Sequence, residues 1–176
     1  MAMSGEVGTR LFGRDVTLAV SWPWAVYWIA FLRVLVGTVF LHAGMDKLLA
    51  DQPFTAGWWL TGTASEGVLG TVMVWFGQNA PWFVDFVIPF GELFIGIGLI
   101  VGGLTRLASF FGATLMFFLY FGNADWEHGF VNGDLLLLVL FITLIIFGGG
   151  RIWGLDSYLE KTETVQKYPR LRYLLG

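Results

Sequence analysis

The chain alternates between long apolar runs and short polar or glycine-rich connections. Four runs, at 23–41, 81–101, 104–122 and 131–147, come close to the about 17 to 25 residues that a helix needs to cross a bilayer. Backbone polar groups in hydrocarbon must be satisfied within their own segment, so each run predicts a spanning helix. We expect an all-α integral membrane protein, an antiparallel four-helix transmembrane bundle.

Two further segments are too polar or too short to cross. The segment 65–78 contains apolar residues and predicts a short interfacial or re-entrant helix between the first two spans. It would serve either as a lid over a cavity that opens outward or as an anchor with no ligand. The tail, 154–176, predicts a short helix on the cytoplasmic surface, and the whole of 1–176 is expected to form a single membrane domain.

Composition supports the membrane assignment and removes several function classes. Of 176 residues, 56% are hydrophobic and 13% charged, unlike an ordinary soluble domain. The absence of cysteine excludes disulfides, thiolate nucleophiles and Cys-ligated metals. No basic block accompanies the net charge of -3, which argues against nucleic-acid binding. His42 and His128 have no histidine partner at helical spacing, so no metal site is expected.

The distribution of basic residues predicts the orientation. Lysine and arginine favour the cytoplasmic side of membrane spans. Lys47 is alone on one side of the runs, and the side that holds both termini carries Arg10, Arg14, Arg106, Arg151, Lys161, Lys167, Arg170 and Arg172. We therefore expect a multi-pass protein of the cell membrane with both termini in the cytoplasm.

Two charged residues lie inside the apolar runs. Arg33 is near the middle of the first run and Glu92 near the middle of the second. An unpaired charge there costs at least about 2.5 to 3.5 kcal/mol, and residue counting gives the two a matching depth. We expect them to form an ion pair. This pair would either fix the register of the helices or act in proton transfer or headgroup binding.

Other polar residues extend this feature toward the outer face. Asp85 lies seven residues before Glu92, on the same face of its helix, and Asp134 has a similar depth in the last run. Lys47 and His42 lie near the outer end of the first run. An apolar cavity with a few such groups suits a quinone, whose two protons a buried carboxylate could relay. A lipid-headgroup site or a packing contact would leave the same pattern.

A short internal repeat connects the first two spans. Its two sets share the same offsets: Arg33, Gly37, Gly44 and Lys47, then Glu92, Gly96, Gly103 and Arg106. The sets are either an inverted pair of the kind found in transporters or a packing requirement that recurs, because small residues let helix backbones approach.

These motifs resemble the DoxX/DoxD family of small four-helix membrane proteins. The resemblance rests on RVLVGTVFLHAGMDKL at 33–48, on GEL at 91–93, on Thr105 with Arg106, and on NGD at 132–134. It extends to the glycine-rich stop at 148–150 and to the Leu155–Asp156 pair. By this resemblance Arg33, Lys47, Glu92 and Arg106 match recurring charged positions, and Asp134 lies where many members carry an acid.

The resemblance also implies a function. DoxD is the larger subunit of an archaeal thiosulfate:quinone oxidoreductase, which implies a membrane subunit that passes electrons from a sulfur compound to quinone. The chain lacks a cysteine to take up sulfur and a fused redox domain. It would carry no intrinsic cofactor, with quinone as bound substrate, and a partner subunit would supply the redox centre.

Three hypotheses result. The first is a quinone-linked oxidoreductase subunit in which Arg33 and Glu92 are catalytic and the quinone-binding residues are Lys47, Asp85, Asp134, Arg106 and His42. The second is a non-catalytic accessory or assembly subunit of a respiratory or other membrane complex. The third is a small transporter. Expected partners are membrane lipid, a redox subunit or larger membrane complex, and a second copy of the chain.

Overall fold

The computed structural model, which describes residues 4–11, 14–123 and 129–176, is dominated by helices. Three of them are long and apolar enough to cross a membrane: α1 (Trp22–Leu49), α4 (Pro81–Val101) and α5 (Thr105–Asn123). A fourth, α6 (Gly133–Phe147), is apolar but only 15 residues long. The expected helix boundaries agree closely, except that α1 continues to Leu49 instead of ending at residue 41.

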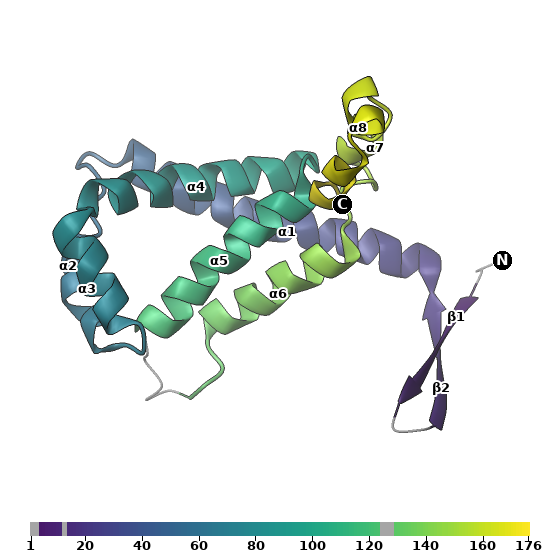
Figure 1. The fold of residues 1–176 in the computed structure, drawn as a ribbon, viewed down its shortest axis with the longest axis horizontal. Helices are drawn as coiled ribbons and strands as arrows, with labels where there is room; N and C mark the ends of the chain where they lie inside the picture. Colours follow the sequence, from purple (N-terminus) through teal and green to yellow (C-terminus); the bar gives the residue numbers. More distant parts are fainter. Residues whose placement is uncertain (1–3, 12–13, 124–128) are drawn as a thin grey trace.

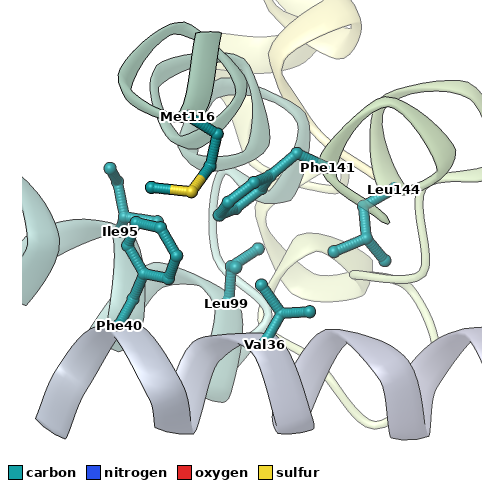
Figure 2. Close-up of a cluster of buried hydrophobic side chains, with 7 residues drawn as sticks. All are labelled: Val36, Phe40, Ile95, Leu99, Met116, Phe141 and Leu144. Atoms are coloured by element: carbon teal, nitrogen blue, oxygen red, sulfur yellow. The ribbon is translucent and has the colours of Figure 1, made fainter. Parts of the chain in front are cut away.

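Successive helices of the four alternate in direction along the chain, as Figure 1 shows. α1 packs along α4, and α5 packs along α6, whereas α4 and α5 diverge from the tight turn that joins them. All four contribute to one buried cluster, drawn in Figure 2, which consists of Val36, Phe40, Ile95, Leu99, Met116, Phe141 and Leu144. Phe40 and Phe141 meet edge to face there, with ring centroids 4.8 Å apart.

Glycines set the register between α1 and α4. A Cβ on Gly44 would lie 2.6 Å from the backbone nitrogen of Leu93, and one on Gly96 would collide with the backbone of Leu41. A Cβ on Gly37 would similarly lie 2.9 Å from the Cβ of Leu99. These contacts fix how the second half of α1 lies beside the antiparallel α4, because only glycine allows such a close approach.

One end of the helices carries a small cap. It consists of α2 (Gly57–Thr61), η1 (Thr63–Glu66) and α3 (Gly70–Asn79), packed around Ala56, Leu60, Ala64 and Met73. The expected helix at 65–78 corresponds to α3, which begins at residue 70 and is held in the cap by the buried Met73. We call this end of the molecule the cap end.

The opposite end carries the turn between α4 and α5 and the C-terminal tail, and we call it the turn end. The tail folds into α7 (Asp156–Leu159), α8 (Glu163–Lys167) and η3 (Pro169–Leu174). Fully buried Asp156 fastens it, because its carboxylate accepts hydrogen bonds from the backbone N–H groups of Leu104, Thr105 and Gly176. The tail and the start of α1 lie at the same end (Figure 1).

A β-hairpin precedes α1, and the sequence analysis assigned no structure to this segment. Strands β1 (Ser4–Leu11) and β2 (Arg14–Ser21) pair antiparallel with Ser4 opposite Ser21 and Leu11 opposite Arg14. Figure 1 shows the hairpin standing away from the helices. The fold that positions the polar residues below is therefore built by the helices alone.

Candidate functional site at the cap end of the first helix

An open hollow of about 560 Å³ lies beside the last two turns of α1. Most of its lining comes from α1 and from the chain that follows it: Val39, His42, Ala43, Asp46, Lys47, Ala50, Gln52 and Phe54. The polar members recur on one face of α1 because residues three and four apart are neighbours on a helix. The hollow falls within the usual size range of small-molecule sites.

Lys47, which lines this hollow, forms an ion pair with Glu92 of α4. Lys47 Nζ lies 2.6 Å from Glu92 Oε2 and also donates to the backbone carbonyl of Ala43 at 3.3 Å. The Glu92 side chain is 8% exposed and that of Lys47 26% exposed, so the ammonium lies between the buried carboxylate and the hollow. The Phe54 ring centroid is 5.8 Å from Nζ and adds a cation–π contact.

A second acid–base pair lies one turn away on the same helix. His42 Nε2 and Asp46 Oδ2 are 3.2 Å apart at an i, i+4 spacing, and both side chains are largely exposed. An imidazole beside a carboxylate is an arrangement that can exchange protons. The hollow therefore carries two pairs that are each able to donate and accept protons.

The expected contact between Arg33 and Glu92 is wrong. Arg33 lies at the turn end, where its Nη2 donates to the carbonyls of Ile152 and Trp153 at 3.3 and 3.4 Å, and Glu92 pairs with Lys47 instead. The matching depth of Arg33 and Glu92 follows from an apolar run that ends at residue 41, but α1 continues to Leu49. The glycine contacts instead place Glu92 opposite the last turns of α1.

Two of the expected quinone-binding acids take part in the packing of the cap. Asp85 Oδ1 accepts from the backbone N–H of Ala56 at 2.6 Å, at the start of α2. Asp134 Oδ2 accepts from the Asn123 amide at 3.0 Å, and Asn123 Oδ1 accepts from the Trp59 indole at 2.8 Å. The contacts of both acids therefore hold α2, α4, α5 and α6 together at the cap end.

The remaining expected residues divide between the two ends. Lys47 and His42 line the hollow and Glu92 is paired with Lys47, whereas Arg106 lies at the turn end near Gly148. Asp46 and Phe54 line the hollow but were not among the expected site residues. The i, i+4 spacing of His42 and Asp46 was available in the sequence as a signal for Asp46, but no sequence pattern indicates Phe54.

A separate apolar groove of about 800 Å³ lies between α4 and α5 and is closed at the cap end by α2 and α3. Its walls come from the diverging faces of the two helices, with Phe86, Phe90, Phe94, Phe111 and Phe118 among the larger side chains. It lies on the side of α4 away from α1, so it does not open onto the Lys47–Glu92 pair.

The described part of the chain contains no group of three or more His, Asp or Glu side chains that could hold a metal ion. His128, the second histidine of the sequence, lies outside the described residues. The polar side chains that line the hollow include proton donors and acceptors, those of Lys47, His42 and Asp46.

Helix lengths and composition define the class: the chain is a membrane protein with three candidate spans. The family follows from a comparison with family models, in which the DoxX model matches residues 28–123, more than half of the chain. The chain belongs to the DoxX family. The match extends from the first turns of α1 to the end of α5 and includes the Lys47–Glu92 pair. No solved structure matches the chain.

Proposed function

We propose that this chain is a membrane subunit that binds quinone in the hollow at the cap end of α1 and serves a quinone-linked oxidoreductase. The observation that carries the proposal is that Lys47, His42 and Asp46 line one open hollow, with Lys47 paired to the buried Glu92 at 2.6 Å and His42 paired to Asp46. Family membership supports it, because DoxX is a membrane family often linked to quinone oxidoreductase-related subunits.

The residues suit the needs of a quinone headgroup. Reduction of a quinone to a quinol takes up two electrons and two protons, one proton at each carbonyl oxygen. The Lys47 ammonium and the His42 imidazole can donate hydrogen bonds to those oxygens, and Phe54 offers an aromatic face to the ring. The two protons come from water, and the carboxylates of Glu92 beside Lys47 and Asp46 beside His42 can take them up and pass them to these two groups.

The electrons must come from a partner. Because the sequence has no cysteine, we assign the redox centre to a second subunit. A sulfur compound such as thiosulfate is the electron donor that the resemblance to DoxD implies. In this arrangement α6 is the fourth span, the turn end with both termini is cytoplasmic, and the hollow opens toward the opposite face.

The first experiment is purification from native membranes in mild detergent, with identification of all co-purifying polypeptides and extraction of bound quinone. Quinone together with a redox subunit supports the proposal. A recurring respiratory or transport complex without stoichiometric quinone refutes it and favours the accessory-subunit alternative, in which the Lys47–Glu92 pair only fixes the packing of α1 against α4.

A variant then tests the pair directly. Glu92→Gln keeps the size of the side chain and one acceptor oxygen but removes the proton-exchanging group. We expect at least about a tenfold loss of quinone-dependent turnover, because removal of a positioned acid–base group commonly costs 100-fold or more. The thermal stability of the variant should change little. Lys161→Gln, at an exposed position of the tail, is the matched control. Full turnover in Glu92→Gln would exclude Glu92 from proton transfer.

A further inference from the structure

Unpaired buried polar atoms gather at the turn end. In the part of the chain that the structure describes, four buried side-chain nitrogen and oxygen atoms lack a hydrogen-bond partner: Arg33 Nε, Arg33 Nη1, Thr105 Oγ1 and Arg106 Nε. Arg33 is 1% exposed and Thr105 is fully buried. Because buried polar groups are nearly always hydrogen-bonded, this concentration at one place requires an explanation.

The protein itself does not satisfy these donors. The carboxylate of Asp156 accepts hydrogen bonds from three backbone N–H groups, those of Leu104, Thr105 and Gly176, at 2.7, 3.1 and 2.9 Å. Neither Arg33 nor Arg106 forms an ion pair with a described residue.

Glycine backbone packs closely against these unpaired atoms. A Cβ on Gly102 would collide with Arg33 Nη1, and one on Gly150 would collide with Thr105 Oγ1. A Cβ on Gly148 would lie 3.8 Å from Arg106 Nε. The unpaired atoms therefore face the backbone of the loop 148–154 and of the α4–α5 turn.

Backbone strain is found at the same place. In the described part of the chain the non-glycine residues with positive φ are Leu104, at 52°, and Trp153, at 50°. Leu104 donates its N–H to Asp156, and Trp153 accepts from Arg33. Such conformations cost about 1 to 3 kcal/mol each and tend to occur at functional sites.

We propose that the turn end binds a phosphate- or sulfate-type oxyanion through Arg33, Thr105 and Arg106. Guanidinium groups match the geometry of such oxyanions and form strong charge-assisted hydrogen bonds with them, and the Thr105 hydroxyl adds one further donor. The anion is either the phosphodiester headgroup of an anionic lipid or a free inorganic anion. This site is independent of the proposed quinone function at the other end of the molecule.

The experiment uses the full chain in nanodiscs and measures its melting temperature by intrinsic tryptophan fluorescence. One series has discs of phosphatidylcholine alone with increasing inorganic phosphate, and the other replaces part of the phosphatidylcholine with phosphatidylglycerol. Because a ligand that binds only the folded state stabilises it, we expect a rise of about 3 to 6 °C in at least one series. A rise with phosphatidylglycerol alone identifies the lipid headgroup, and a rise with phosphate identifies a free oxyanion.

Variants separate this site from general surface charge. Arg106→Gln should lose most of the rise, whereas Arg151→Gln should keep it. Arg151 is the matched control because it lies at the same end, with a side chain that is 56% exposed and paired with Glu160. Thr105→Val removes one donor at nearly constant volume and is the second test if Arg106→Gln does not fold. No rise in either series would overturn the proposal and indicate that water satisfies the donors. An equal loss in Arg151→Gln would overturn it as well.

Discussion

A single added methyl group at Gly44 should both destabilise the protein and disturb its candidate site. A Cβ at this position would lie 2.6 Å from the Leu93 nitrogen and 2.9 Å from the Pro89 carbonyl oxygen. Both neighbours are backbone atoms, so no side chain can turn away. In Gly44→Ala the helices α1 and α4 must therefore separate by up to about 1 Å to restore ordinary van der Waals contact.

The cost can be estimated from overpacking. Extra methyl groups in a well-packed contact typically cost about 1 to 3 kcal/mol, and the rigidity of the neighbours here favours the upper half of that range. Lys47 lies less than one turn beyond Gly44, and its 2.6 Å contact with Glu92 bridges the same two helices. The separation should lengthen that contact, so Gly44→Ala is also expected to weaken quinone binding if the hollow is the site.

Gly91→Ala is the matched control. Gly91 lies in the same helix as Leu93, but a Cβ there would meet nothing within 4 Å because the position faces the apolar groove. Thermal unfolding of both variants in the same detergent checks the prediction. Gly91→Ala should stay within about 1 kcal/mol of the parent, or gain slightly from helix propensity. The reasoning is refuted if Gly44→Ala unfolds at the parent temperature, or if both variants lose the same stability.

Two further substitutions test the core and the attachment of the tail. Phe141→Ala should lose about 3 to 5 kcal/mol of unfolding free energy, because Phe141 is fully buried against Phe40. Ile142→Ala, at an exposed position of the same helix, should lose much less in the same denaturation assay. Equal losses would contradict the assigned core. Asp156→Asn should lower the free energy of unfolding by about 2 to 3 kcal/mol, because an amide cannot accept from all three backbone N–H groups that the carboxylate binds. Limited proteolysis should release the tail of this variant earlier than that of the control Glu163→Gln. An unchanged cleavage rate would mean that Asp156 does not hold the tail.

The sequence allowed four apolar helices to be predicted, three of which are long enough to be candidate spans, because crossing a bilayer demands long, uninterrupted apolar runs. The observed boundaries of α4 are the expected residues 81–101, and those of α5 and α6 lie within two residues of the expected ones. The end of α1 was missed because His42, Asp46 and Lys47 resemble an interfacial boundary. In the structure these residues continue the helix, since His42 and Asp46 pair within it and Lys47 pairs with α4.

The partner of Glu92 was missed for a related reason. Residue counting measures depth from the ends of a hydrophobic run, whereas the pairing of two helices depends on where their backbones can approach. In the structure the close approaches at Gly44 and Gly96 set this pairing and bring Lys47, not Arg33, to Glu92. The contacts that Asp85 and Asp134 make at the cap end depend on the start of α2 and on the Asn123 side chain, and no periodicity of the sequence predicts either.

The geometry of α1 divides the expected site into two. Arg33 and Lys47 are fourteen residues apart in one continuous helix, which corresponds to about 21 Å along its axis. A quinone headgroup is only a fraction of that length, so no single headgroup can contact both residues. The quinone hypothesis therefore depends on the cap-end residues alone, and Arg33 needs a separate role at the turn end. Because the two sites share a rigid helix but no ligand, Glu92→Gln should leave the oxyanion-dependent stabilisation intact, and Arg106→Gln should leave quinone binding intact.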